Sequence, residues 1–509
     1  MNLATALHRS ATLNPGSPAL IQGGETRRSY DQWSAEVATL AGGLRTLVRE
    51  PGARVVLWLP NCPEYLTLLY ASWHAGLCVV PANCKLHARE VEFIVRHVRA
   101  RVLLVDAAHR RALAEAGIDL APAHVVDVGS AAYEALRDGP RAPLAERAAD
   151  DAAWIFFTSG TTGRPKGAVL TLRNLTAMSL AYFADYGAIG PDERLLHAAP
   201  LSHGSGLYAL PFTMKGAAHV LTTASTFDPA EVIELTNRHG ATTAFLAPTM
   251  LNRVVAAIER HPLDPSRLRK FLYGGAPMHL EDLKRALRAL GPRIAQLYGQ
   301  GETPMTISYL PAEAHGSGDA LADDAVLTSV GYVRTGVEVS IRAPDGTSLP
   351  AGECGEIAVR GDTVMREYWE DPAATARALR DGWLYTGDLG TFDTAGRLHL
   401  HGRAKELIIS GGSNIYPREV EDVLLAHPGV REVAVVGVPD PEWGEAVIAH
   451  VVASPDATAE RLDSFCLERI ARFKRPKRYV FHEELPKNGA GKLDKLELQR
   501  RHSGSVRTG

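Results

Sequence analysis

The densest group of side chains that could bind an anion is the segment TSGTTGRPKG, residues 158–167. It holds four hydroxyl side chains, three glycines and Lys166. Glycines allow backbone N–H groups to approach an oxyanion closely, and the hydroxyls and the ammonium add further donors. The pattern predicts a polyphosphate-binding loop in preference to a flexible polar loop. The Walker A spacing GxxxxGK[ST] is absent, which disfavours a classical P-loop nucleotide hydrolase.

A second candidate lysine lies near the C-terminal end of the sequence, in PKNGAGKLDK, residues 486–495. Gly489 and Gly491 precede Lys492 and favour a turn. The stretch by itself is compatible with a solvated surface turn or with a lysine that acts in a cleft.

The predicted elements that position the first loop alternate between strand and helix. The loop follows a predicted strand at 154–157 and precedes a predicted helix at 173–184. An apolar, β-branched run at 53–60 predicts a buried strand, and helical spacing follows at 64–76 and at 278–292. Continuous apolar strands between amphipathic helices predict an α/β fold with parallel or mixed sheets.

The last hundred residues predict a small α+β domain. A helix is expected at 414–430, followed by a strand at 431–439 and a later strand at 477–484. Its boundary is expected near 398–406, where a short strand meets a Gly-Arg turn. The Ala-, Gly- and Asp-rich stretch 311–325 predicts a surface loop.

Composition narrows the class of protein. The chain has 509 residues, 46% hydrophobic residues and a net charge of −3. These values are typical of a globular protein and give no electrostatic reason to expect nucleic acid as a partner. Five cysteines without CxxC spacing favour neither a disulfide framework nor a structural zinc site. No signal peptide and no transmembrane segment are expected, so we predict a cytoplasmic protein.

The 158–167 segment resembles the phosphate loop of the adenylate-forming superfamily, which includes acyl- and aryl-CoA synthetases, luciferases and adenylation domains. The resemblance covers nearly the whole chain, because further motifs follow in family order. These are HAGLCVVPANCKLHAREVEFIV (74–95), PLSHGSG (200–206), YGGAP (273–277), YGQGETP (298–304), GWLYTGDLG (382–390), HGRAKELIISGGSNIYPREVE (401–421) and LPKNGAGK (485–492).

The resemblance implies a set of residues that bind the nucleotide and coenzyme A. Asp388 and Arg403 resemble the pair at the ribose and phosphates, and Tyr298 resembles the ring that stacks on adenine. Glu302 is the implied magnesium ligand, with Thr158 beside it. The full set of implied binding residues is Thr158, Ser159, Gly160, Thr161, Thr162, Gly163, Lys166, Gly274, Gly275, Ala276, Tyr298, Gly299, Gln300, Thr303, Asp388, Arg403, Lys405, Gly411 and Gly412.

The resemblance also implies that Lys492 is catalytic, together with Arg403 and His203. A cation between the carboxylate and the α-phosphate stabilises the charge that develops during adenylation. In the family a small C-terminal domain rotates between two half-reactions. We therefore predict an N-terminal domain at 1–402 and a small mobile domain at 403–509, with Lys405 at the hinge and Gly411 and Gly412 beside the pantetheine channel.

One motif departs from the family pattern. A threonine usually precedes the magnesium-binding glutamate, whereas this chain has Gly301 there and Thr303 on the other side of Glu302. Either the Thr303 hydroxyl or a backbone N–H would have to replace the missing contact with the α-phosphate.

The acid is expected to be apolar or aromatic and of medium size. Gly299 stands where acetyl-specific relatives carry a tryptophan, and Leu297 stands where malonate-type relatives carry an arginine. Candidate lining residues are Leu207, Tyr208, Phe212 and Phe245, with His203 either gating the pocket or serving a structural role. The basic run at 472–478 is either a contact for coenzyme A phosphates or a solvated face.

These inferences predict an ATP-dependent acyl-CoA ligase that uses Mg²⁺ and coenzyme A and releases pyrophosphate and AMP. The alternatives are an acyl-AMP ligase that loads a carrier protein and a non-catalytic relative that binds nucleotide or acyl groups. The identity of the acid and the oligomeric state stay open, with a homodimer as one option.

Overall fold

The structure is a computed structural model that describes residues 2–158, 165–276, 278–317, 320–410, 413–487 and 493–503. The chain forms two compact units. The first comprises Met1–Pro277, Lys284–Val339 and Val359–Leu384, and the second comprises Met278–Leu283, Ser340–Ala358 and Tyr385–Gly509. The predicted division at 402/403 concerns which part moves as a body, and it stays a prediction.

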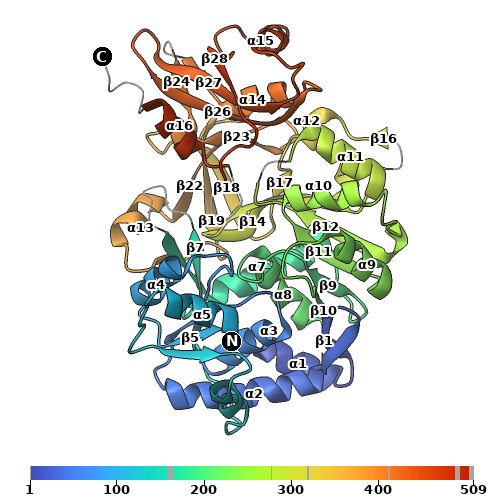
Figure 1. Ribbon diagram of the computed structural model, residues 1–509, viewed down its shortest axis with the longest axis vertical. Helices are drawn as coiled ribbons and strands as arrows, with labels where there is room; N and C mark the ends of the chain where they lie inside the picture. The colour runs from blue at the N-terminus through green and yellow to red at the C-terminus, as the bar shows by residue number, and fades with distance from the viewer. Residues whose placement is uncertain are drawn as a thin grey trace. The chain divides into compact units, whose positions relative to one another are not determined.

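The first unit contains two mixed sheets (Figure 1). In one of them the central strands are parallel and antiparallel strands form both edges. Its order is β17 (Tyr332–Val333), β14 (Thr303–Leu310), β13 (Ile294–Gln300), β12 (Leu268–Tyr273), β11 (Thr242–Leu246), β9 (Arg194–His197), β10 (Ala218–Leu221), β1 (Pro18–Gln22) and β2 (Glu25–Ser29).

The other sheet carries the predicted phosphate loop. Its order is β20 (Glu367–Tyr368), β8 (Lys166–Thr171), β7 (Ala152–Thr158), β4 (Cys78–Pro81), β3 (Arg54–Trp58), β5 (Val102–Val105) and β6 (His124–Asp127). The strands from β7 to β6 are parallel, and β8 and β20 are antiparallel additions. The predicted α/β class with mixed sheets is therefore confirmed.

Alternation along β3 explains why this strand reads as continuously apolar. Val55 and Leu57 belong to a core that contains side chains from both sheets. Val56 and Trp58 belong to a second core under α4 (Ala88–His97) and α5 (Ala107–Glu115). Because successive side chains point to opposite faces, a strand covered on both sides is apolar at each buried position, here Val55–Trp58.

Two helical runs predicted from the sequence are confirmed among the helices that lie wholly or mostly in the first unit. The run at 64–76 forms α3 (Pro63–His74), and 278–292 forms α11 (Leu280–Leu290). The others are α1 (Thr5–Leu13), α2 (Tyr30–Leu47), α6 (Ala131–Arg137), α7 (Leu172–Tyr186), α8 (Gly204–Met214), α9 (Pro229–His239), α10 (Pro248–Ala257), α12 (Asp324–Leu327) and α13 (Pro372–Ala378).

The structure adds to two sequence predictions about this unit. The strand β8, which was not predicted, lies between the phosphate loop and the predicted helix, and α7 begins where Thr171 and Asn174 form a capping box. The stretch 311–325 is not simply a surface loop. It contains the 3-10 helix η2 (Ala312–His315), and the His315 side chain is fully buried, with its Nδ1 bonded to the Pro311 carbonyl oxygen.

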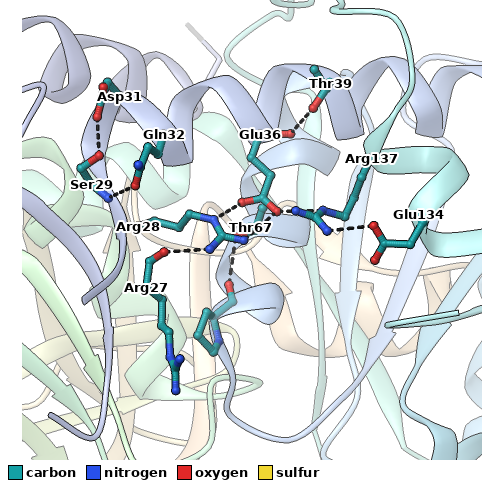
Figure 2. Close-up of polar contacts among 11 residues, drawn as sticks. Arg27, Arg28, Ser29, Asp31, Gln32, Glu36, Thr39, Thr67, Glu134 and Arg137 are labelled. Carbon is teal, nitrogen blue, oxygen red and sulfur yellow. Dashed lines mark hydrogen bonds and ion pairs between the residues drawn. The ribbon is translucent and has the colours of Figure 1, made fainter. Parts of the chain in front are cut away.

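A carboxylate joins three elements at the N-terminal end of this unit. Glu36 of α2 accepts hydrogen bonds from Nε of Arg28 on β2 at 2.6 Å and from Nε of Arg137 on α6 at 3.1 Å (Figure 2). Arg137 also donates to Glu134 at 2.8 Å. The Glu36 side chain is only 13% exposed, so its carboxylate is largely shielded from water.

The second unit has its own sheet. Its order is β25 (Ser413–Ile415), β24 (Ile408–Ser410), β27 (Gly444–Ala453) and β26 (Val430–Asp440), and β28 (Arg478–Phe481) pairs with β27. The helices α14 (Pro417–Leu425) and α16 (Lys495–Ser503) pack against β26, and α15 (Ala459–Leu467) packs on α14 (Figure 1). The predicted helix at 414–430 is shorter than expected, because its first residues form β25 and Pro417 starts the helix.

The remaining sheet contains residues that are assigned to both units. It contains β18 (Val337–Arg342), β19 (Gly355–Gly361), β22 (Trp383–Phe392) and β21 (Leu379–Arg380), with β23 (Leu398–Arg403) paired to β22. The small pair β15 (Gly316–Ser317) and β16 (Ala320–Leu321) completes the described strands.

Candidate active site

The predicted phosphate loop connects two paired strands. Ser159, Gly160, Thr161, Thr162 and Gly163 lie outside the described residues. Thr158 ends β7 and Lys166 begins β8, and these two residues face each other in the antiparallel register. The described flanks therefore place one hydroxyl and one ammonium at the base of the connection.

Glu302 is held in place by two hydroxyl donors. Its Oε1 accepts hydrogen bonds from Thr158 Oγ1 at 3.1 Å and from the Tyr368 hydroxyl at 2.7 Å. The Lys166 ammonium lies 5.1 Å from the centre of the Tyr368 ring. The Glu302 carboxylate between β13 and β14, the Thr158 hydroxyl of β7 and the Lys166 ammonium of β8 therefore lie close to the Tyr368 side chain of β20.

Tyr368 is a site residue that the sequence analysis missed. It pairs with Ala168 of β8, which brings its hydroxyl to Glu302 although 66 residues separate the two in sequence. Nothing in the local sequence REYWE distinguishes this tyrosine from one that only packs against a core. The contact depends entirely on the β8–β20 pairing.

The residues around Glu302 suit a magnesium ion that is bound mainly by substrate. No group of three or more His, Cys, Asp or Glu side chains able to hold a metal occurs among the described residues. Mg²⁺ is commonly held by one or two carboxylates together with phosphate oxygens. Glu302, with the Thr158 hydroxyl beside it, fits this pattern.

The structure explains why a glycine precedes Glu302. A Cβ atom at residue 301 would lie 2.5 Å from Cγ2 of Thr158 and 2.7 Å from Cδ1 of Phe156. The space that a threonine would need is therefore filled by the end of β7. Of the two replacements considered for the missing hydroxyl, the Thr303 side chain is fully buried and bonds to Thr306 and Thr363, which favours a backbone N–H.

The glycines of the predicted adenine site lie where strands approach closely. A Cβ at Gly274 would lie 2.5 Å from the Leu297 carbonyl oxygen, so this glycine is required by the packing of β12 on β13. Gly275 has a φ of +81° and is exposed, as is Ala276. Tyr298 is buried in β13 and Gln300 is half-buried at its end.

Gly299 lies where the backbones of two strands approach closely. A Cβ there would lie 2.5 Å from the backbone nitrogen of Met305 and 2.9 Å from the Thr303 carbonyl oxygen. The β13–β14 register shifts at this point, and the two backbones come together. The close packing explains the glycine, and the expectation that its lack of a tryptophan side chain favours an acid larger than acetate stays a prediction.

His203 lies at the start of α8, close to the Glu302 group. Its Nδ1 is 2.8 Å from Ser202 Oγ, and its ring makes an edge contact with Phe156 at a centroid distance of 5.3 Å. Phe156 is also the ring that borders Gly301. Of the candidate acid-pocket residues, Leu207, Tyr208 and Phe212 are buried within α8 and Phe245 is half-buried.

In the second unit, Asp388 and Arg403 form an ion pair. Arg403 Nε lies 2.7 Å from Asp388 Oδ1, and the two residues face each other in the β22–β23 register. The carboxylate side chain is 11% exposed, whereas the guanidinium side chain is 44% exposed. The Arg403 guanidinium is therefore exposed to solvent, whereas the Asp388 carboxylate that pairs with it is largely buried in the sheet.

Lys405 follows Arg403 in the short 3-10 helix η3 (Ala404–Glu406). Partial burial lowers the pKa of the Lys405 ammonium below its ordinary value, and the neighbouring Arg403 adds to this effect. Gly411, Gly412 and Lys492 lie outside the described residues. Their described neighbours are paired, since Ser410 faces Ser413 and Lys487 forms a bridge with Leu493.

The predicted site residues thus fall into two groups. Thr158, Lys166, His203, Tyr298 and Glu302 belong to the first unit, as do the other described residues of the adenine site. Asp388, Arg403 and Lys405 belong to the second unit. The first unit places the Glu302 carboxylate and the Lys166 ammonium beside the phosphate loop. The second unit contributes the Arg403 guanidinium paired with the Asp388 carboxylate.

The fold, with its large mixed-sheet unit and smaller second unit, is that of an adenylate-forming enzyme. The chain matches the family model for AMP-binding enzymes over residues 7–369 and that for the AMP-binding enzyme C-terminal domain over 419–492. It belongs to the AMP-binding enzyme family. The predicted membership in the adenylate-forming superfamily is confirmed.

Similar proteins span the whole chain. A feruloyl-CoA synthase from Amycolatopsis sp is 38% identical over 97% of both chains. The long-chain-fatty-acid–CoA ligase FadD13 of Mycobacterium tuberculosis is 32% identical over 99% of both. The structure of ATP-bound MatB from Rhodopseudomonas palustris is 30% identical, with a TM-score of 0.87 over 100% of both chains. Among the described residues, no helix is long and apolar enough to cross a membrane.

Proposed function

We propose that this protein is an ATP-dependent acid–thiol ligase that forms acyl-CoA in two steps. In the first, a substrate carboxylate attacks the α-phosphorus of ATP, which gives an acyl-adenylate and releases pyrophosphate. In the second, the thiol of coenzyme A attacks the acyl carbon and AMP leaves. The observation that carries this proposal is the Glu302 group at the phosphate loop, in a chain that matches curated CoA ligases along its length.

Each group of residues has a part in these steps. Lys166 and the hydroxyls of the loop would bind the phosphates. Glu302 would hold Mg²⁺, which neutralises phosphate charge when it is bound. Thr158 and Tyr368 orient the Glu302 carboxylate. Asp388 would accept hydrogen bonds from the ribose hydroxyls, with Arg403 beside the phosphates. Lys492 would stabilise the charge that develops between the two anions during adenylation.

The acid that best fits is an apolar or aromatic one of medium size. The buried face of α8 offers Leu207 and Phe212, and the half-buried Phe245 lies beside its first turn at Gly204. Leu297 brings no cation for a second carboxylate. A feruloyl-CoA synthase among the most similar curated proteins supports the aromatic option. We also propose a cytoplasmic enzyme, and leave the homodimer as an option to be measured.

The decisive experiment is acid-dependent pyrophosphate release across a panel of acids. We expect release with cinnamate-type or medium-chain acids and little with acetate or malonate. Mass spectrometry with and without coenzyme A, or with an acyl-carrier protein, then identifies the acceptor. A carrier product without a coenzyme A product would indicate the carrier-loading alternative. Nucleotide binding without release on any acid would indicate a non-catalytic protein.

The role of Lys492 is tested by separating the two half-reactions. We expect Lys492→Ala to reduce adenylation by about a hundredfold or more, because the transition-state charge loses its cation. Thioester formation from supplied acyl-adenylate should be unaffected. Equal loss of both half-reactions would show that Lys492 does not act specifically in adenylation.

A further inference from the structure

Lys495 is a largely buried cation that joins three segments of the second unit. Its Nζ lies 2.8 Å from Glu421 Oε1 and 3.2 Å from Glu406 Oε2. Lys495 begins α16, Glu421 belongs to α14, and Glu406 ends η3. The side chains of Lys495 and Glu421 are 19% and 11% exposed. One cation between two carboxylates in this setting is strongly held, because removing it leaves uncompensated buried charge.

The charge state of this group is set by its two carboxylates. Burial alone would lower the pKa of the Lys495 ammonium, but Glu421 and Glu406 more than reverse this effect, so its pKa is raised. Glu421 is fixed further, since its Oε1 accepts a hydrogen bond from the backbone N–H of Val435 on β26 at 2.8 Å. The triad is therefore anchored to the sheet of this unit.

Lys495 stands at the base of the segment that carries Lys492. Lys487 and Leu493, which flank residues 488–492, form a β-bridge. The Asp494 backbone N–H donates to the Pro486 carbonyl oxygen at 2.9 Å. Both ends of the segment are thus held together, and the next residue, Lys495, ties that base to η3. The same 3-10 helix follows Arg403 and contains Lys405.

We propose that Lys495 is a positioning residue for adenylation, because it fixes the base of the Lys492 segment against the turn that bears Arg403 and Lys405. This inference rests on the proposed function, in which Lys492 acts in adenylation. An ion pair that only stabilises the unit would affect both half-reactions alike. A positioning residue affects mainly the half-reaction that uses Lys492.

The test compares the two half-reactions in full-length variants, with the best acid from the panel. For Lys495→Met we expect the kcat of acid-dependent pyrophosphate release to fall about tenfold or more, because small displacements of a catalytic group are costly. The KM for ATP and the rate of thioester formation from supplied acyl-adenylate should change by less than about twofold, and Lys495→Arg should recover most of the adenylation rate.

Two further variants make the test decisive. Glu406→Gln keeps the Lys495–Glu421 pair and weakens only the link to η3, so it should show the same selective loss to a smaller degree. It also decides the question if Lys495→Met fails to fold. Arg501→Met is the matched control, because Arg501 lies on the same helix as Lys495 and its pair with Glu497 at 3.2 Å is exposed on both sides, so neither half-reaction should change by more than about twofold.

Three outcomes are distinguishable. Selective loss of adenylation supports the positioning role. Equal loss of both half-reactions in Lys495→Met and Glu406→Gln, or wild-type adenylation in both, overturns it. Absence of pyrophosphate release from the wild-type enzyme on every acid would instead refute the proposed function itself.

Discussion

Gly301 occupies a position where a larger residue has no room. The end of β7 fills the space beside it, and Thr158 uses its hydroxyl to hold Glu302. The departure from the family motif and the Thr158–Glu302 hydrogen bond are thus parts of one local arrangement. A threonine at 301 would have to displace the residue that orients the carboxylate.

We predict that Gly301→Ala lowers the rate of pyrophosphate release by about tenfold or more, since the new Cβ would push Thr158 away from Glu302. Thr158→Ser removes Cγ2 but keeps the hydroxyl, so adding it to Gly301→Ala should restore part of the rate. Steady-state rates of the two single variants and the double variant form the cycle. Strictly additive losses would show that the two residues do not compete for space.

Tyr368 is the second hydroxyl donor to the Glu302 carboxylate. Removing a hydrogen bond to a charged group costs about 1.5–3 kcal/mol. We therefore expect Tyr368→Phe to reduce kcat/KM for ATP by about tenfold, without a change in thermal stability large enough to explain it. Tyr332→Phe, at an exposed tyrosine of the same unit, is the control. Unchanged kcat/KM in Tyr368→Phe would mean that Thr158 alone orients Glu302.

At the scale of elements, Glu36 links α2, β2 and α6 through Arg28 and Arg137 (Figure 2). Glu36→Gln keeps the shape of the side chain but removes the charge that both guanidinium groups use. We expect the free energy of unfolding to fall by about 1–3 kcal/mol, with activity at 25 °C unchanged. Urea denaturation measures the change.

The control for Glu36→Gln lies on β2, the strand that also carries Arg28. Glu25 pairs with Arg27 at 2.9 Å, but both side chains are exposed. Glu25→Gln should therefore leave the denaturation midpoint unchanged, because exposed pairs contribute little. A Glu36→Gln midpoint equal to that of Glu25→Gln would mean that the three elements are held by apolar packing alone.

At the scale of the whole molecule, buried histidines make stability depend on pH. Burial lowers the pKa of His219 to about 3 and that of His315 to about 4. Burial, with the nearby His502 and His482, lowers the pKa of His450 to about 4. The unfolded chain binds these protons below about pH 6.5, whereas the folded chain does not until near pH 4.

We therefore predict that stability falls as pH decreases from about 6.5 to 4, by up to about 2 kcal/mol for each of these histidines at pH 5. Urea denaturation at pH 7.5 and 5.0 measures the loss. His315→Asn should reduce the difference between the two pH values, since one of the titrating groups is removed. Equal or greater stability at pH 5.0 would contradict the prediction.

The sequence by itself determined the kinds of element, the order of the motifs and the family. Apolar runs and helical spacing are local properties, so β3, α3, α7 and α11 were predictable to within a few residues. The motif residues were identifiable because each chemical role requires particular residue types at a particular spacing. Their roles in this chain remain predictions that the half-reaction experiments address.

Only the tertiary structure decided which side chains meet. The Tyr368–Glu302 bond, the collision that a side chain at 301 would cause, and the Lys495 triad all join segments far apart in sequence. Gly299 illustrates the limit most clearly. Its sequence position gave no sign that two strand backbones meet there and exclude a Cβ atom. Steric contacts of this kind depend on strand pairing and register, which a single sequence does not specify locally.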